Sequence, residues 1–141
     1  MRVFYIDLEN IGMKRLSYIL RELCKKEDIV KIVRSRACNV VDENLEILLG
    51  RYSKLSISLI SSDIMRKNWA DNIIRMQLAL DIGSENSIRD VFICSADSDL
   101  LDSIGEFVKG VKSYINVYSA TSVKGTEPIT LRKYTEDAGW I

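Results

Sequence analysis

Short apolar segments rich in β-branched residues alternate along this chain with longer segments in which apolar residues recur every three or four positions. The first pattern predicts buried or half-buried strands, and the second predicts amphipathic helices. The predicted strands cover residues 2–7, 28–35, 55–61, 90–95 and 113–119. The predicted helices cover about residues 11–26, 42–52, 68–83 and 97–109. For residues 120–141, the turn-forming residues Gly125 and Pro128 predict a loop, and a short terminal helix is predicted after it.

This alternation predicts a three-layer α/β/α fold around a mostly parallel sheet of five strands. Right-handed crossovers permit few strand orders. The strands at 2–7 and 90–95 are the most hydrophobic, so we place them side by side at the centre of a sheet with the order 3-2-1-4-5. Ligands of such sheets bind beyond the carboxyl ends of the strands, where the direction of winding reverses. Here that point lies between these two central strands.

The composition is that of one globular domain covering residues 1–141, with 47% hydrophobic residues and no internal repeat. Charged residues interrupt the apolar runs too often for a membrane span, and Asp7 comes too early for a signal peptide. Cys24, Cys38 and Cys94 are scattered and odd in number, which favours a reducing cytoplasm over a disulfide framework. We therefore expect a cytoplasmic protein without a membrane partner.

The net charge and the absence of histidine limit the partners and the catalytic groups that this protein can use. Twenty basic and twenty acidic residues give no net charge, so the overall charge does not indicate a nucleic-acid partner. The chain contains no histidine, which excludes histidine-based acid–base catalysis and zinc sites with histidine ligands. Any hydrolysis must therefore use carboxylates, lysine or a water activated by a metal ion.

Four aspartates are predicted to lie at the carboxyl edge of the sheet. Asp7 closes the first strand, Asp97 and Asp99 follow the fourth, and Asp71 lies in the first turn of the third helix. A carboxylate at a helix start is common because it caps the helix and interacts with its dipole, which explains one acid but not the whole set. Several neighbouring carboxylates would repel each other, and a divalent cation removes that conflict. All-oxygen ligands suit Mg²⁺ or Mn²⁺, so we predict that these acids bind one of these ions.

Basic residues are predicted around the same rim, at the ends of the second, third and fifth strands. They are Arg34, Arg36, Arg66, Lys67 and Lys124. An acidic centre surrounded by cations fits a phosphodiester, with the metal ion at the scissile phosphate and the cations on the flanking phosphates. The distribution of charge, rather than its total, thus favours a phosphodiester as the substrate.

Three segments together resemble one known family. They are 3-VFYIDLENIG-12, 67-KNWAD-71 and 92-FICSADSDL-100. In this order, and at predicted strand and helix ends, they are similar to the NYN (LabA-like) branch of the PIN-like nucleases, and the resemblance covers roughly residues 2–120. It implies a PIN-like α/β/α fold and a metal-dependent endoribonuclease that hydrolyses RNA phosphodiester bonds with a metal-activated water.

The resemblance also implies roles for individual residues. Asp7, Asp71 and Asp97 would hold Mg²⁺ or Mn²⁺, and Asp99 would be an additional catalytic and metal-binding acid. The residues expected to support the site or contact RNA are polar or basic: Asn10, Arg34, Arg36, Lys67, Asn68, Ser95 and Ser98. Many relatives carry a further aspartate on the central helix at the position of Gln77.

Two alternatives to a ribonuclease stay open. The first is a catalytically weak or inactive module of the same fold that binds RNA or protein, which Gln77 favours slightly. The second, an aspartate-dependent phosphotransfer domain, ranks lower. Asp7-Leu8-Glu9 lacks the Asp-x-Asp pattern of haloacid-dehalogenase-like phosphatases, and Ser119-Ala120-Thr121 lacks the lysine of receiver domains. The sequence leaves open single-stranded or structured RNA, and a homodimer or a protein partner.

Overall fold

The computed structural model describes residues 1–35, 40–62, 68–121 and 129–141. The strands are β1 (Arg2–Asp7), β2 (Ile29–Ser35), β3 (Ser56–Ser62), β4 (Asp90–Cys94), β5 (Asn116–Thr121), β6 (Thr130–Thr135) and β7 (Gly139–Trp140). The helices are α1 (Leu8–Tyr18), which continues into the π-helical turn η1 (Ile19–Leu23), α2 (Asp42–Gly50), α3 (Trp69–Ser84) and α4 (Ser98–Val111). Strands and helices alternate up to β5, as the sequence predicts.

The strands form one sheet with the order β3-β2-β1-β4-β5-β6-β7. The pairs from β3 to β5 are parallel, so the predicted order of the five parallel strands is confirmed. The predicted strand count was too low, because β6 and β7 extend the sheet with antiparallel pairing. Strands β1 and β4 are neighbours at the centre, and the winding direction reverses between them.

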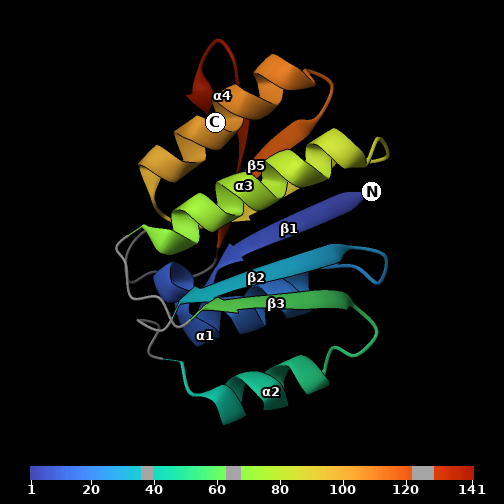
Figure 1. Ribbon diagram of the computed structural model, residues 1–141, viewed down its shortest axis with the longest axis vertical. Coiled ribbons are helices and arrows are strands. Elements are labelled where there is room, and N and C mark those ends of the chain that lie inside the picture. The colour runs from blue at the N-terminus through green and yellow to red at the C-terminus, as the bar shows by residue number, and fades with distance from the viewer. Residues whose placement is uncertain (36–39, 63–67, 122–128) are drawn as a thin grey trace.

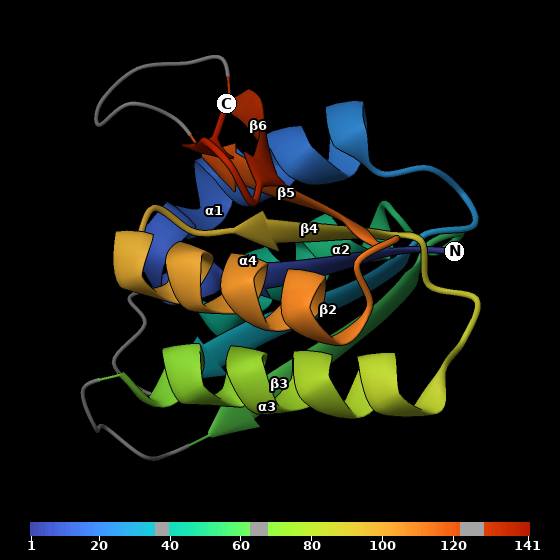
Figure 2. The same cartoon turned by 90° about the horizontal axis from the view of Figure 1, so that it is seen from above.

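The sheet is the middle layer of an α/β/α arrangement, which confirms the predicted fold class. Helices α3 and α4 cover one face, and α1 and α2 cover the other (Figures 1 and 2). Alternate residues of β1 serve the two cores, because side chains along a strand point to opposite faces. Val3 and Tyr5 pack with α3 and α4, whereas Phe4 and Ile6 pack with α1 and α2.

The last strands correct the prediction of a short terminal helix. Residues 130–135 pair with β5 instead, with Tyr118 opposite Lys133 and Thr121 opposite Thr130. This pairing covers the edge of β5, which would otherwise present unpaired backbone groups. The side chain of Tyr134 packs edge-on against Trp140, with 5.2 Å between the ring centroids. The predicted loop through Gly125 and Pro128 lies outside the described residues.

A glycine in α4 allows this hairpin to pack against the helix. A Cβ atom at Gly105 would lie 2.6 Å from Cδ2 of Tyr134, which is closer than real contacts permit. We expect Gly105→Ala to lower the free energy of unfolding by about 1–2 kcal/mol, although alanine favours helix formation. Urea denaturation measures this change. Gly110→Ala, in the same helix with open space around it, is the matched control; equal stability of both variants would contradict the packing role of Gly105.

Two further sequence expectations concern compartment. Within the described ranges, no helix combines the length and the apolar character needed to cross a membrane. Cys24 and Cys94 are free thiols, and Cys38 lies outside the described residues. A cytoplasmic location stays a prediction.

Candidate active site

A cavity of about 310 Å³ opens at the carboxyl edge of the sheet, where the winding direction reverses. Three segments line it: the end of β1 with the first turn of α1, the start of α3, and the loop between β4 and α4. Its lining residues are Asp7, Glu9, Asn10, Asn68, Ala70, Asp71 and Asp97. The structure thus brings together three of the four predicted acids, from positions far apart in the sequence.

Asp7 is the deepest acid of this cavity, with 4% of its surface exposed. The Ser95 hydroxyl donates a hydrogen bond to its Oδ2 atom at 3.2 Å. Burial raises the pKa of Asp7 to about 6, although the hydrogen bonds from Ser95 and from the Asn10 backbone favour the charged form. The nearby charges of Glu9 and Asp97 raise this pKa further.

Asp71 and Asp97 form a pair of neighbouring carboxyl groups whose pKa values are shifted in opposite directions. Asp71 is the third residue of α3 and 8% exposed, and its pKa is raised to about 7 by burial, by a hydrogen bond with Asp97 and by the Asp97 charge. The pKa of Asp97 is lowered by this same hydrogen bond and by backbone N–H groups of α4. Opposite shifts of this kind are expected for two acids that interact in one site.

The loop that carries Asp97 is held by four hydrogen bonds. Asp97 caps α4, because its Oδ1 atom accepts hydrogen bonds from the backbone N–H groups of Asp99 at 3.0 Å and Leu100 at 3.2 Å. The Asp97 N–H donates to the Ser95 hydroxyl at 3.2 Å. The Ala96 N–H donates to Oδ1 of Asn10 at 2.8 Å. Ser95 and Asn10, predicted to contact substrate, thus fix the acids in place.

The start of α1 also differs from the prediction. The helix begins at Leu8, directly after β1, rather than at residue 11, and Asn10 is its third residue. Gly12, with φ of 76°, then interrupts the helical backbone, a conformation that favours glycine. This short first turn places Glu9 beside the end of β2 and Asn10 beside the loop after β4.

Asp99 and Ser98 are among the predicted site residues that lie outside the acidic cavity. Asp99 and Ser98 are exposed in the first turn of α4, and neither lines it. Ser98 lines the neighbouring cavity beside β5 and β6 instead. A catalytic and metal-binding role of Asp99 stays a prediction.

The predicted basic rim is only partly described. Arg34 forms an ion pair with Asp42 and donates to the Val40 carbonyl at 2.7 Å, and it does not line the acidic cavity. Asn68 does line this cavity, with a left-handed backbone conformation at φ of 67°. The other four basic residues lie outside the described residues: Arg36, Arg66, Lys67 and Lys124.

Glu9 is an acid of the cavity that was not predicted. It lines the cavity and accepts a hydrogen bond from the Ser35 hydroxyl at 2.5 Å, which ties the start of α1 to the end of β2. Its spacing of two residues from Asp7, at the end of a strand, was the available signal. It adds a fourth carboxylate to this cavity.

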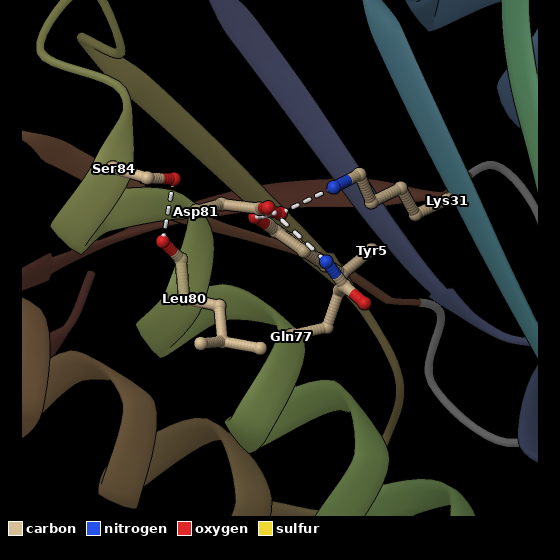
Figure 3. Close-up of polar contacts among 6 residues, drawn as sticks. All are labelled: Tyr5, Lys31, Gln77, Leu80, Asp81 and Ser84. Atoms are coloured by element: carbon tan, nitrogen blue, oxygen red, sulfur yellow. Dashed lines mark hydrogen bonds and ion pairs between the residues drawn. The ribbon is translucent and has the colours of Figure 1, made fainter.

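Gln77 belongs to a separate polar network between α3 and the sheet (Figure 3). Asp81 is its centre and accepts hydrogen bonds from the Tyr5 hydroxyl at 2.6 Å, the Lys31 ammonium at 2.6 Å and the Gln77 amide at 3.1 Å. Burial, followed by the interaction with Asp81, raises the pKa of Tyr5, so this phenol stays a donor. An aspartate at position 77 would place a second carboxylate against Asp81, which gives glutamine a structural reason to be here.

The types of side chain that line the acidic cavity suit a hard divalent cation, but their positions do not form a complete set of metal ligands. Across the described ranges, no group of three or more Asp, Glu or Cys side chains stands in an arrangement that could hold a metal ion. The donors are nevertheless the carboxylate and amide oxygens that Mg²⁺ and Mn²⁺ prefer. A cation bound between Asp71 and Asp97 would neutralise both charges, and it would compete with the proton that the raised pKa of Asp71 favours.

Comparisons with known proteins bear on the fold. No family model and no curated protein sequence matches the chain. Among solved structures, the chain is similar to Enterococcus italicus Csm6 bound to cyclic hexa-2′-fluoro-hexa-dAMP. The TM-score is 0.54 and the sequence identity 10%, over 90% of this chain and 35% of that one. This chain thus spans about a third of the Csm6 chain, and the likeness supports the α/β architecture alone.

Proposed function

We propose that this protein is a metal-dependent endoribonuclease of the NYN (LabA-like) type within the PIN-like nucleases. The observation that carries the proposal is the convergence of Asp7, Asp71 and Asp97 in one cavity at the carboxyl edge of the sheet. The resemblance of three sequence segments to that family supports it. The likeness to Csm6, whose solved structure holds a cyclic oligonucleotide, supports a ligand made of nucleotides.

The residues of the cavity would have different roles in this reaction. Asp7, Asp71 and Asp97 would hold Mg²⁺ or Mn²⁺, which supplies charge neutralisation at the scissile phosphate and an activated water. Ser95 orients Asp7, and Asn10 holds the loop that carries Asp97. Asn68, at the start of α3, lies where its amide can donate to a phosphate oxygen. With no histidine in the chain, the carboxylates and a water activated by the ion would supply the acid–base chemistry.

The direct test is cleavage of labelled RNA, single-stranded and structured, with Mg²⁺, with Mn²⁺ and with EDTA. We expect cleavage with either ion and none with EDTA. A protein that cleaves neither RNA under any of these conditions would contradict the nuclease proposal.

A second candidate function is RNA binding without cleavage. Gln77 favours it, because this side chain donates a hydrogen bond to Asp81 and supplies no charge where many NYN relatives carry an aspartate. The same experiment separates the two functions. Binding of RNA that is unaffected by EDTA, without cleavage, would support the binding module.

Metal binding and pH are linked through Asp71. Its pKa rises from 3.8 in the unfolded chain to about 7 in the folded protein, so the folded state binds the proton more tightly. The contribution of Asp71 to the free energy of unfolding is therefore fully present at low pH and is lost as the pH rises from about 4 to about 7. We expect Asp71→Asn, in EDTA, to be more stable than the wild type at about pH 8, by about 1–2 kcal/mol, and not at about pH 4.

Thermal unfolding at several pH values measures this difference. Mg²⁺ or Mn²⁺ should raise the melting temperature of the wild type more at about pH 8 than at about pH 5, because the ion competes with the proton. Asp71→Asn should lose most of that shift. An ion-induced shift that is equal in both proteins would place the ion elsewhere.

A further inference from the structure

A second cavity lies on the other side of the loop that carries Asp97. Its volume is about 470 Å³, and it opens between α4 and the strands β5, β6 and β7. Ala96 and Ser98 line it, whereas Asp97, between them in the chain, lines the acidic cavity. The two cavities are thus separated by the thickness of one loop. None of the proposed catalytic acids lines the second one.

Paired strands present polar side chains to this cavity. Ser119 of β5 is opposite Arg132 of β6, and Thr121 is opposite Thr130, so the four side chains share one face of the sheet. All four line the cavity. Ser119 is 1% exposed, and what remains accessible lies at this cavity. A hydroxyl in the wall of a cavity can form a hydrogen bond with a ligand that enters it.

An arginine and a tryptophan complete the wall. One terminal nitrogen of Arg132 donates to the Trp140 carbonyl at 3.0 Å, which places the guanidinium beside the cavity. The indole N–H of Trp140 donates to Asp102 at 3.0 Å, and Tyr134 packs against the ring edge-to-face. The indole is therefore held in one orientation, with part of its surface still accessible. A fixed aromatic ring beside a cation is suited to stack a base and bind a phosphate.

We propose that this cavity binds one nucleotide of the RNA substrate, next to the phosphate positioned at the acidic cavity. Trp140 stacks on the base, Arg132 pairs with a phosphate, and the hydroxyls of Ser119, Thr121 and Thr130 bond to the ribose or the base edge. The volume is in the range of sites for small organic ligands, which runs from about 300 to 1,000 Å³. The assignment of RNA rests on the proposed function, and it adds to it a subsite for recognition.

Equilibrium binding in EDTA tests the subsite apart from catalysis. The probe is a fluorescein-labelled single-stranded RNA oligonucleotide, followed by anisotropy with the full chain. We expect Arg132→Gln to weaken binding about tenfold and Ser119→Ala about threefold, in line with the loss of a charged and of a neutral hydrogen bond. Arg89→Gln is the matched control. Arg89 directly precedes β4, at the amino end of this strand, where it packs on the ring of Tyr114 and does not line the cavity.

Tryptophan fluorescence gives a second readout. The chain has two tryptophans, so Trp69→Phe leaves Trp140 as the single reporter. RNA should quench its emission, and Arg132→Gln should abolish that quenching at the same RNA concentration. Should Arg132→Gln lower the melting temperature, Ser119→Ala decides, since this substitution removes one hydroxyl and leaves the charge of the protein unchanged.

The outcomes separate the subsite from the nuclease. Weaker binding by both variants, in a protein that cleaves no RNA, would support the subsite and contradict the nuclease. Metal-dependent cleavage with unchanged binding by both variants, or RNA binding without quenching of Trp140, would overturn the subsite and leave the nuclease standing. A wild type that binds no RNA would overturn the subsite as well.

Discussion

Asp97→Asn is expected to lower the rate of metal-dependent RNA cleavage by about 100-fold or more, because even substitutions of residues that only support metal ligands cost about 10–100-fold. Asparagine has nearly the same shape as aspartate, and its Oδ1 atom can still accept hydrogen bonds from the N–H groups of Asp99 and Leu100. The helix cap is thus kept, and the charge that would hold the ion is lost. Initial rates on labelled single-stranded RNA with Mg²⁺ or Mn²⁺ measure the effect.

Asp137→Asn is the matched control for that experiment. Asp137 is an exposed acid in the turn between β6 and β7, so the same chemical change there should leave the rate unchanged. Asp99→Asn should cause a smaller loss than Asp97→Asn, since the Asp99 side chain lies outside the acidic cavity. Cleavage that survives Asp97→Asn, still dependent on metal, would point to a contaminant or to a wrong site.

Lys31→Met is expected to lower the free energy of unfolding by about 3 kcal/mol, and the melting temperature by roughly 10 °C. Lys31 and Asp81 form an ion pair at 2.6 Å, with 18% and 17% of their side chains exposed. Without the lysine, the Asp81 carboxylate stays in a shielded place with only the neutral donors Tyr5 and Gln77. Removing one partner of a buried ion pair costs more than the pair contributes, because the other charge is left uncompensated.

Chemical denaturation measures this change, and Lys54→Met is the control. Lys54 is exposed, so its replacement by methionine should change stability little. The double variant Lys31→Met with Asp81→Leu should recover part of the lost stability, because the uncompensated charge is gone. The ion-induced rise of the melting temperature should persist in Lys31→Met, since this network does not line the acidic cavity. If Lys31→Met lowered the free energy of unfolding by less than about 1 kcal/mol, the pair would contribute no more than an exposed ion pair, which would contradict this prediction.

The parallel part of the fold could be predicted because its signals are local. The apolar runs at 2–7 and 90–95 and the helical periodicity between them record burial directly, and the rules of crossover leave few strand orders. The tail could not be predicted in this way. Whether residues 130–135 form a strand depends on the free edge of β5 and on the space that Gly105 leaves for Tyr134. Neither is visible within the segment itself.

The sequence by itself determined which acids could meet, because parallel strands end at the same edge and a helix starts beside them. Asp7, Asp71 and Asp97 meet there. Only the tertiary structure decided the orientation of the other polar groups. The early start of α1 brings Glu9 into the cavity, and Asn10 accepts a hydrogen bond from the loop that carries Asp97, whereas Asp99 does not line the cavity. The bonds of Glu9 with Ser35 and of Asn10 with Ala96 join segments that are far apart in the sequence, so residue spacing alone does not encode them.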